Sequence, residues 1–596
     1  MYLRFLSGPK AVLLPVAAMV FLALFPQLFF ILKAGSWNGS YVASNYDEPA
    51  YSAYVNSLIE GKPRKNDPFT GAADSPATPQ PETLYSIQFI PAYSIALPAR
   101  ILGLSVSTAF IILAVVLAML SALALYWFLL EVTKDPEAAI IGPIVVLCFG
   151  TAAAFQGELR GIFDSRVLAD YLPFLRRYQP GLAFPGFFVF CLLVWKAVRA
   201  KTAVKTVFLA AAAGSVFAAL VFSYFYIWTA AAAWLVCFVA ATMLFDRSLM
   251  GRSLITSAVV GLGAAAALVP YFSLLSKRSP NLDSVQLLSL TRTPEFASPS
   301  MWIGVMVVAA SLILIKRETP AFGKLPLIIS LSLLPAAVFN QQIITGRSLQ
   351  PIHYELFIGN YAVLAAAVLL ISSWRTSKID VPGFGRGLAY LGLAAFSWGL
   401  FEAYGSTSRN FTAAEIRDAT MPPVAAAVKN LSPAAPVILG TNFVTADFIP
   451  SVGSARALWN PHTSSAGGVG ISENKRLFYM FLYFSGYGDR DLDAALRANS
   501  FEVTAAIFGS ERALPSLGTG GISISNDEIT GEVARYANFI KELAAQDAYN
   551  PAIDHIIVPA EAEPSFANLD RWYKRGEGQT FGLFRSYRLT PTSAVQ

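Results

Sequence analysis

Charged residues are scarce in this chain of 596 residues: Asp, Glu, Lys and Arg make up 14% of it, against 55% hydrophobic residues. A soluble domain usually contains about a quarter charged residues, so a single globular body in water is excluded. Cysteine is nearly absent, and Cys148, Cys191 and Cys237 all stand within apolar runs. A disulfide scaffold is therefore excluded. The three histidines are too far apart in sequence for a recognisable zinc motif.

The formal net charge is +6. No basic segment contains the interleaved aromatic residues of a protein that binds single-stranded nucleic acid, so we expect no nucleic-acid partner. In a chain this apolar, a positive surplus is typical of basic loops that lie against anionic headgroups. Membrane lipids are therefore expected partners.

Long apolar runs are abundant, and their lengths of roughly 15 to 28 residues predict membrane-spanning helices. The first run, about Ala11 to Leu32, is longer than a signal-peptide core and indicates an uncleaved anchor. With it, the sequence predicts a polytopic α-helical membrane protein with about 11 transmembrane helices. The Pro-containing segment Phe89–Leu102 is short for a span, so we expect it to be re-entrant or interfacial. The further spans are expected at 104–131, 138–155, 181–199, 206–222, 228–245, 253–275, 301–315, 325–339, 359–374 and 388–404.

The short loops on one side of these spans hold most of the basic residues, for example Lys196, Arg199, Lys201 and Lys205. Cytoplasmic loops are enriched in Lys and Arg, so this side is expected to be cytoplasmic, together with the N-terminus. An odd number of spans then places the C-terminal region outside. The expected location is a multi-pass protein of the bacterial inner membrane with a periplasmic, extracytoplasmic C-terminal domain.

The composition changes near residue 405, which predicts a transmembrane domain at 1–404, with its first external loop at 34–88, and a separate domain at 405–596. In the second domain the apolar runs have strand length and alternate with helical patterns at Arg490–Ala498 and Glu528–Ala545. This alternation predicts a C-terminal extracytoplasmic α/β domain. The expected strands are Pro436–Gly440, Val503–Gly509, His555–Pro559 and Phe581–Leu589.

The first external loop contains two adjacent acids, Asp47 and Glu48, just before an apolar stripe at helical spacing that ends at Gly61. The stripe predicts an amphipathic helix along the membrane surface. One interpretation is purely structural: Asp47 is the N-cap, and Glu48 is a first-turn acid favoured by the helix dipole. The other interpretation is that these acids carry chemistry.

The second interpretation is favoured because Gly61 to Asp67-Pro68 follows the acids and a Pro-rich apolar segment, Leu84–Leu102, comes next. Together these features resemble the GT-C superfamily of membrane glycosyltransferases, which includes protein O-mannosyltransferases, the aminoarabinose transferase of lipid A and oligosaccharyltransferases. The tail contains no W-W-D-Y-G signature, which argues against an oligosaccharyltransferase.

The resemblance implies transfer of a sugar from a polyprenyl-phosphate-linked donor to a glycan, lipid or protein acceptor at the membrane surface. It implies a carboxylate that acts as general base on the acceptor hydroxyl, for which Asp47 is the first candidate and Glu48 the second. Asp67 is a candidate substrate contact. A divalent cation, Mg²⁺ or Mn²⁺, would be bound by Asp47 and Glu48 if the enzyme uses one, but two adjacent acids leave the metal requirement open.

A leaving phosphate needs cationic donors, and Arg suits it best. Two external loops supply candidates: Arg176 and Arg177 in one, Arg347 with His353 in the other. The alternatives are a solvated connector with internal ion pairs for the first loop, and a polar turn with Arg347 extended toward lipid headgroups for the second. Further candidate substrate contacts in the second loop are Gln341, Gln342, Tyr354 and Glu355.

The sequence thus predicts a membrane glycosyltransferase of GT-C type with Asp47 as base. Two alternatives stay open: a transporter or flippase of lipid-linked glycans, and a non-catalytic membrane scaffold. A transporter is expected to place ionisable residues at mid-membrane and to show two related halves. This chain keeps its charges at the ends of spans and shows no halves, which favours the enzyme.

Overall fold

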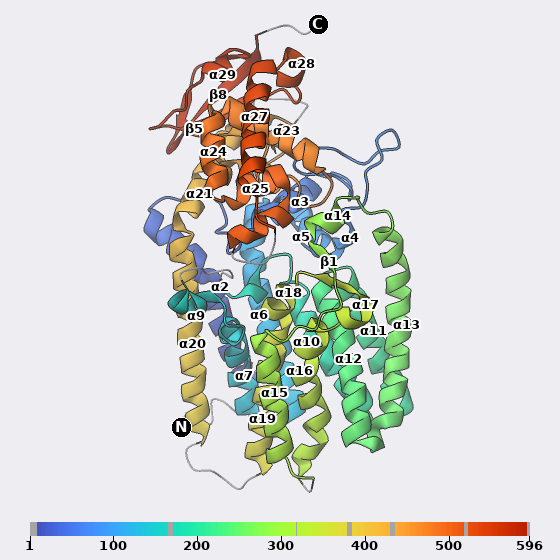
Figure 1. Ribbon diagram of the computed structural model, residues 1–596. Coiled ribbons are helices and arrows are strands. Elements are labelled where there is room, and N and C mark those ends of the chain that lie inside the picture. Colours follow the sequence, from blue (N-terminus) through green and yellow to red (C-terminus); the bar gives the residue numbers. More distant parts are fainter. Residues whose placement is uncertain are drawn as a thin grey trace. The chain divides into compact units, whose positions relative to one another are not determined.

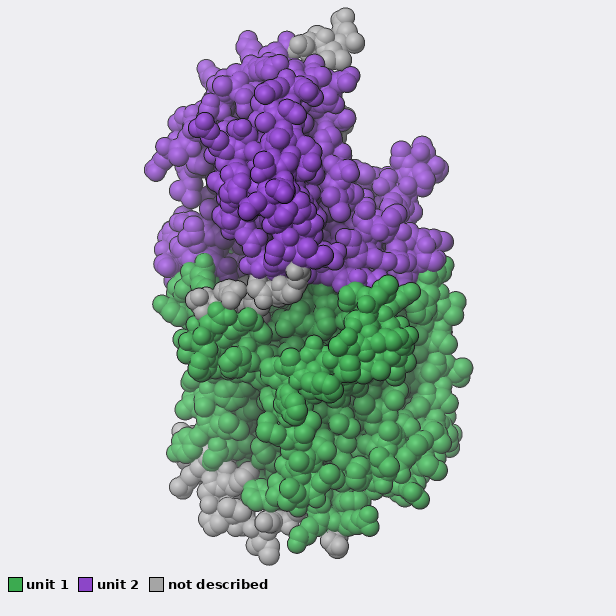
Figure 2. All heavy atoms as spheres, viewed as in Figure 1, with its two compact units in different colours: residues 1–29, 111–274, 289–409 green, residues 30–110, 275–288, 410–596 purple. Residues whose placement is uncertain are grey.

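The computed structural model describes residues 9–164, 171–317, 319–377, 384–429, 435–517 and 522–592. The chain divides into two compact units, coloured separately in Figure 2. The first comprises Met1–Phe29, Ile111–Leu274 and Ser289–Arg409. The second comprises Phe30–Phe110, Leu275–Leu288 and Asn410–Gln596. The first external loop therefore belongs to the same unit as the C-terminal region.

The first unit is a bundle of long helices, most of which lie alongside one another in Figure 1. Helix α12 packs against α11 and α16, and α19 packs against α7, α15 and α16. A Cβ atom added at Gly263 on α13 would lie 3.0 Å from Cα of Gly214 on α11, so these glycines allow the two backbones to approach closely. The longer helices of this unit are α2 (Leu13–Ala34), α6 (Val106–Thr133), α7 (Pro136–Cys148), α10 (Phe184–Val198), α11 (Ala203–Val221), α12 (Phe225–Phe245), α13 (Met250–Leu275), α15 (Pro299–Leu314), α16 (Leu325–Phe339), α19 (Asn360–Ser377) and α20 (Phe384–Arg409).

Every span expected from the sequence coincides with a helix. Among the described residues, seven helical segments are long and apolar enough to cross a membrane. Helices α7, α10 and α15 are apolar but shorter, and α20 does not meet the same criterion. The prediction of a polytopic membrane protein is thus supported, and the count of about 11 spans is not confirmed. The segment that we expected to be re-entrant or interfacial forms a helix, α5, with the bounds Phe89–Leu102.

Short elements connect these helices in the first unit. Their bounds are α8 (Gly150–Ala153), α9 (Gly157–Phe163), η2 (Pro173–Leu175), α17 (Gln342–Thr345), α18 (Ile352–Tyr354), the π-helical turn η5 (Glu355–Gly359), β1 (Leu288–Leu290) and β2 (Arg347–Leu349). Strands β1 and β2 form a two-stranded sheet.

The second unit contains a mixed sheet surrounded by helices. Strand β3 (Val437–Gly440) pairs in parallel with β4 (Arg456–Ala457) and with β5 (His555–Pro559). Strand β5 pairs in antiparallel fashion with β8 (Phe584–Pro591), which also pairs with β6 (Tyr573–Arg575) and β7 (Gln579–Phe581). The helices are α3 (Glu48–Ile59), α4 (Leu84–Ile87), α5, α14 (Leu282–Val285), α21 (Phe411–Lys429), α22 (Phe443–Phe448), η6 (Ile449–Ser451), α23 (Ile471–Phe484), α24 (Asp489–Arg497), α25 (Phe501–Phe508), α26 (Ser510–Ala513), α27 (Asn526–Glu542), α28 (Ala545–Ala548) and α29 (Ala567–Asp570).

The expected alternation of strands and helices in the C-terminal region is present, with one correction. The strands expected near 436–440, 555–559 and 581–589 and both expected helices are there, but Val503–Gly509 is not a strand. It lies in helix α25, whose side chains Val503 and Ile507 are buried in the core of the unit. A short apolar run does not by itself distinguish a strand from a buried helix. Here the run is a helix that packs into the core of the second unit.

Helix α3 is not amphipathic toward solvent as the apolar stripe suggested, because most of its polar residues are buried as well. All of its residues except Ser57 and Ile59 are buried, which leaves it without a solvent-facing polar side. It packs against α5, α22 and η6. The Nδ2 atom of Asn56 donates to the carbonyl of Pro450 at 3.1 Å, and the hydroxyls of Ser52 and Ser451 lie 2.5 Å apart. These polar positions therefore bind the C-terminal region instead of water.

Candidate active site

Asp47 stands at the N-terminus of α3, but its side chain does not cap the helix. The residue occupies the N-cap position with helical dihedral angles and makes no side-chain cap hydrogen bond. Its own backbone N–H donates to Oδ1 of Asn45 at 2.9 Å. The first two residues of α3 are Glu48 and Pro49, and proline is well suited to this position because it needs no hydrogen-bond acceptor there. The purely structural interpretation of Asp47 as a capping side chain is therefore not supported.

The C-terminal region brings a histidine–aspartate pair to the same place. Nδ1 of His462 lies 2.7 Å from Oδ1 of Asp447, which is part of α22. The backbone of His462 is held by a turn, in which its N–H donates to Oδ1 of Asn460 at 2.8 Å and Ser465 N–H donates to its carbonyl at 2.9 Å. Both members of the pair are buried. Nε2 of His462 is buried too and has no hydrogen-bond partner among the described residues.

The charges around His462 favour its protonated form. Burial disfavours the imidazolium, but Asp447 and, more weakly, Asp47 outweigh that effect, and the pKa of His462 is raised above its usual value of 6.5. Arg417 acts in the opposite direction. A loop acid far away in sequence, Asp47, thus belongs to the same electrostatic environment as the buried pair.

Tyr46 covers this pair with its ring. The ring centroids of Tyr46 and His462 are 4.5 Å apart, and Phe501 meets the Tyr46 ring edge-on with a centroid distance of 6.2 Å. Tyr46 retains 42% of its exposure although it packs on a histidine that retains 2%. Tyr46, the residue next to Asp47, is therefore partly accessible.

Glu48 and Asp67, the other acids expected in the first loop, have local structural partners. Glu48 is fully buried, and its carboxylate accepts hydrogen bonds from the N–H of Ser44 at 2.8 Å and from its hydroxyl at 3.2 Å. The Oδ1 atom of Asp67 accepts hydrogen bonds from the N–H groups of Phe69 and Thr70 at 2.8 and 3.0 Å, and these bonds close a turn. Burial raises the pKa of Asp67.

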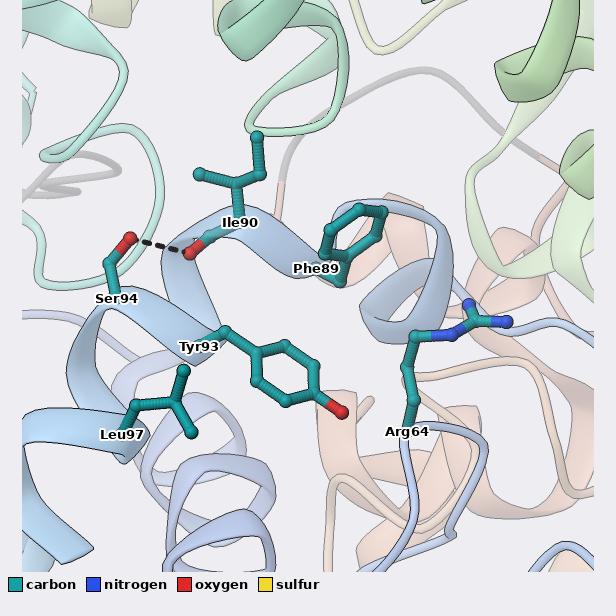
Figure 3. A pocket seen from close by; sticks show the side chains of 6 residues that line it. All are labelled: Arg64, Phe89, Ile90, Tyr93, Ser94 and Leu97. Atoms are coloured by element: carbon teal, nitrogen blue, oxygen red, sulfur yellow. Dashed lines mark hydrogen bonds between the residues drawn. The ribbon is translucent and has the colours of Figure 1, made fainter. Parts of the chain in front are cut away.

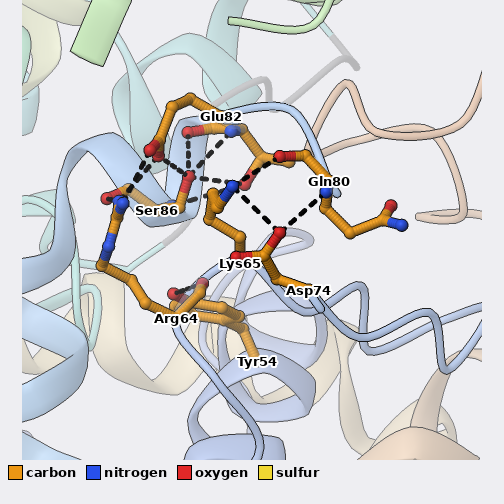
Figure 4. Close-up of polar contacts among 8 residues, drawn as sticks. Tyr54, Arg64, Lys65, Asp74, Gln80, Glu82 and Ser86 are labelled. Atoms are coloured by element: carbon orange, nitrogen blue, oxygen red, sulfur yellow. Dashed lines mark hydrogen bonds and ion pairs between the residues drawn. The ribbon is translucent and has the colours of Figure 1, made fainter. Parts of the chain in front are cut away.

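A polar network shapes the rest of the first loop (Figure 4). Arg64 binds both carboxylate oxygens of Glu82 at 2.6 Å, and the Ser86 hydroxyl donates to the same carboxylate at 2.6 Å. Burial raises the pKa of Glu82, but the Arg64 and Ser86 donors outweigh it and hold the pKa below its usual value. Lys65 pairs with Asp74 at 3.0 Å. Bidentate Arg–carboxylate pairs fix geometry as well as charge, so this network orders the loop.

An open pocket of about 460 Å³ adjoins this network (Figure 3). Arg64 contributes from the loop and the other lining residues come from α5, where Tyr93 extends toward the Arg64 side chain. The lining residues are Arg64, Phe89, Ile90, Tyr93, Ser94 and Leu97. The pocket is mainly apolar, and the charge of Arg64 is already neutralised by Glu82.

In the first unit, two of the four expected phosphate-binding residues come together around one tyrosine. Arg176 donates from Nη2 to the hydroxyl of Tyr224 at 3.3 Å, and this hydroxyl lies 3.4 Å from Nδ1 of His353. The guanidinium of Arg176 stands 4.6 Å from the ring centroid of Phe357, which also packs against His353 at 5.2 Å. Residues about 180 positions apart in the chain therefore share a buried aromatic cluster.

Arg177 and Arg347 are placed differently. Arg177 is buried, like Arg176. Arg347 is exposed on β2, and its carbonyl accepts hydrogen bonds from Gln341 Nε2 at 2.9 Å and from the Thr345 hydroxyl at 3.1 Å. The turn thus holds the Arg347 backbone and leaves its side chain at the surface.

The remaining candidates in the second loop have partners within the first unit. Gln342 donates to the carbonyl of Thr293 at 3.0 Å, and the Tyr354 hydroxyl lies 2.9 Å from that of Thr229. Glu355 is buried and accepts hydrogen bonds from Ser300 N–H at 2.9 Å and from the hydroxyls of Ser298 and Ser300.

Within the described residues, no group of three or more His, Cys, Asp or Glu side chains could hold a metal ion. Glu48 directs its carboxylate to Ser44. The expected Asp47–Glu48 pair thus does not form the donor set that a divalent cation needs, and we derive no step through a metal.

Asp447 and His462 were not identified from the sequence. They are 15 residues apart, with the turn η6 and strand β4 between them, and neither belongs to a motif with a fixed spacing. Only the arrangement of α22 and the segment after β4 brings them together. Two of the three histidines are nevertheless buried in this unit, which is the one signal that would have directed attention to His462.

No protein-family model matches the chain, and no curated protein matches it by sequence. Solved structures do match. One is the apo oligosaccharyltransferase of Archaeoglobus fulgidus, at 11% identity and a TM-score of 0.46 over 99% of this chain and 75% of that one. Another is ArnT from Cupriavidus metallidurans bound to undecaprenyl phosphate, at 11% identity and a TM-score of 0.47 over 96% of this chain and 97% of that one. The chain is thus similar to these two structures at low identity and with TM-scores below 0.5.

Proposed function

We propose that the protein is an integral-membrane glycosyltransferase that transfers a sugar from a polyprenyl-phosphate donor to an acceptor hydroxyl on the extracytoplasmic side, with Asp47 as the base. The donor class follows from the resemblance of the first loop to the GT-C superfamily. The orientation follows from the basic short loops, which place the first loop and the C-terminal region outside the cytoplasm.

One observation supports this proposal more than any other. Asp47 begins a buried helix without capping it, and it is part of one charge cluster with Asp447 and His462. A surface loop acid with a purely local role needs neither the buried pair nor the exposed Tyr46 ring beside it. A buried histidine whose pKa is raised by neighbouring carboxylates is typical of functional sites.

The proposed reaction transfers one proton, forms one bond and breaks another. The Asp47 carboxylate accepts the proton of the acceptor hydroxyl while that oxygen forms a bond to the anomeric carbon of the donor sugar. The bond between the anomeric carbon and the phosphate oxygen breaks, and the polyprenyl phosphate leaves with the electron pair. Cationic and hydrogen-bonding side chains stabilise the charge that develops on the phosphate.

For that phosphate we propose Arg176 and His353, which the first unit gathers around Tyr224, with Arg177 and Arg347 as further donors. Glu48 and Asp67 have no part in this proposal beyond shaping the loop, because Ser44 and the backbone of Phe69 and Thr70 occupy their carboxylates.

The test is mass spectrometry of envelope glycans and glycolipids from a strain that lacks the gene. The strain is complemented with the wild-type protein, with Asp47→Asn or with Asp74→Asn, at equal protein levels in the membrane. Asp74 is the matched control because it lies in the same loop and its carboxylate binds Lys65 and the N–H of Gln80.

The expected result is one sugar that disappears in the deletion strain, returns with the wild type and with Asp74→Asn, and stays absent with Asp47→Asn. The lost mass then identifies the sugar and the acceptor. A full return with Asp47→Asn contradicts the proposal and favours the transporter or the scaffold.

A further inference from the structure

The buried pair of His462 and Asp447 has a geometry that packing alone does not require. The 2.7 Å contact uses Nδ1, so the imidazole is fixed in orientation and its Nε2 atom is directed away from Asp447. That atom is buried and has no hydrogen-bond partner among the described residues. An unpaired buried polar atom costs free energy, so it persists where a functional requirement retains it.

Charged side chains from three segments of the chain interact electrostatically with this imidazole. Asp447 comes from α22, Asp47 and Tyr46 come from the loop before α3, and Arg417 comes from α21. Glu502 of α25 lies in the electrostatic environment of Tyr46. Two carboxylates thus act on one imidazole and one guanidinium opposes them.

We propose that His462, held by Asp447, is a positioning residue for Asp47: it holds the Tyr46–Asp47 segment through its contact with the Tyr46 ring and through its charge. This inference deepens the function proposed above and rests on it for the role of Asp47. His462 itself is enclosed, so it acts through Tyr46 and Asp47 and not by touching the substrate.

The physical argument is that a base works only in the correct orientation. The residue before Asp47 in this loop, Tyr46, packs its ring against His462, with the ring centroids 4.5 Å apart. An imidazolium anchored to Asp447 attracts the Asp47 carboxylate and supports the aromatic ring next to it. Misplacement of a reacting group by about 1 Å can reduce a rate about 100-fold.

The first test does not need activity. The chain contains three histidines, His353, His462 and His555, so a full-length protein with isotope-labelled histidine in lipid nanodiscs gives three imidazole titrations by nuclear magnetic resonance. The variant His462→Gln assigns the signal. We expect the His462 midpoint above 6.5 in the wild type, and a lower midpoint in both Asp447→Asn and Asp47→Asn.

The matched control for this titration is Asp74→Asn, because Asp74 lies in the same loop as Asp47 and its carboxylate binds Lys65 and the N–H of Gln80. It is expected to leave the His462 midpoint unchanged. An unchanged midpoint in Asp47→Asn, or a His462 that titrates at its ordinary value in the wild type, overturns the inference whether or not the protein is a glycosyltransferase.

The second test uses the transfer reaction once a donor is identified by the deletion strain. We expect His462→Gln to lower kcat by about 100-fold with little change in KM, and to remove the alkaline limb of the pH profile. The double variant of His462→Gln with Asp447→Asn is expected to be no worse than the single one. His555→Gln is the matched control.

These outcomes separate the two proposals. If Asp47→Asn is inactive but His462→Gln keeps the wild-type kcat and pH profile, the proposed function holds and the role of His462 is overturned. If the wild type transfers no sugar, the proposed function fails, and the titration alone decides whether His462 and Asp47 are coupled.

Discussion

Asp447 holds His462 through a 2.7 Å contact to Nδ1, and the ring of Tyr46 packs at a tilt against the same histidine, with centroids 4.5 Å apart. One side chain thereby connects the C-terminal region to the residue next to Asp47. The connection depends on charge as well as on packing, because an imidazolium binds Asp447 more strongly than a neutral imidazole does.

The first prediction concerns pH and stability. The pKa of His462 is raised in the folded protein, so its contribution to stability is fully present below about pH 6.5 and is lost as the pH rises through the folded-state pKa. The pKa of His555 is lowered, chiefly by burial, so its contribution is present above about pH 6.5 and is lost as the pH falls. We expect the stability difference between wild type and His462→Gln to shrink at alkaline pH. For His555→Gln, acidification should favour the variant over the wild type. Thermal unfolding followed by tryptophan fluorescence between about pH 5 and 9 measures both.

The second prediction concerns Asp418 on α21, which accepts hydrogen bonds from the beginning of the first loop. Its carboxylate binds the N–H groups of Asn38 and Ser40 at 2.8 and 3.1 Å, and the Ser40 hydroxyl at 2.8 Å. Hydrogen bonds to a buried charge are worth about 1.5–3 kcal/mol each, so we expect Asp418→Asn to lower the unfolding temperature and to expose the first loop to protease. Asp570→Asn, which removes an exposed pair with Arg575, should change neither. Equal protease resistance of the two variants would contradict the prediction.

The third prediction concerns the Arg64–Glu82 pair. Arg64 uses two nitrogen atoms on two carboxylate oxygens, a geometry that a lysine ammonium cannot reproduce. We expect Arg64→Lys to destabilise the first loop although the charge is kept. The pKa of Glu82 is held below its usual value of 4.5, so the stability that the pair contributes is present above about pH 4.5 and is lost as the pH falls through the folded-state pKa. Hydrogen exchange of the segment around Glu82, measured by mass spectrometry at several pH values, should rise in Arg64→Lys and at low pH.

The fourth prediction concerns the glycines at 467–470. Gly467 has a φ of +79°, and a Cβ atom there would lie 3.1 Å from the backbone of Leu282. Gly467→Ala is expected to cost about 1–3 kcal/mol for the unfavourable backbone conformation alone. Gly531→Ala, in the interior of α27 with no close neighbour except the end of Arg535, should be neutral or stabilising by up to about 1 kcal/mol. We therefore expect the unfolding temperature to fall in Gly467→Ala and to stay the same or rise in Gly531→Ala. A higher unfolding temperature in Gly467→Ala would contradict the prediction.

Most helices could be predicted from the sequence because apolar length determines membrane spans almost without tertiary information. The bounds of α5 and the strands β3 and β5 were predicted closely for the same kind of reason: their apolar runs end at polar or turn-forming residues. Short apolar runs say less about secondary structure. The run Val503–Gly509 is compatible with a strand or a helix, and it lies in a helix that is buried in the core of the second unit.

The site was predictable only in part. Asp47 stands in a local motif, so a single stretch of sequence indicates it. Its neighbours Asp447 and His462 follow hundreds of residues later and depend on the fold of a different region. The burial of α3 could not be foreseen either, since its polar residues, such as Asn56, bind the backbone of η6 and not water.

The bonds between Asn38 and Asp418 span 380 residues of chain, and this distance has a consequence for biosynthesis. At synthesis rates of about 5–20 residues per second, the first loop leaves the ribosome roughly 20–75 s before the helix that completes it. Through that interval α3 can pack against α5, but its surfaces that contact α22 and η6 have no partner. The early part of the chain must therefore be protected by a chaperone or by the translocation machinery until the last part arrives, and a fragment that stops before α21 would stay a substrate for quality-control proteases.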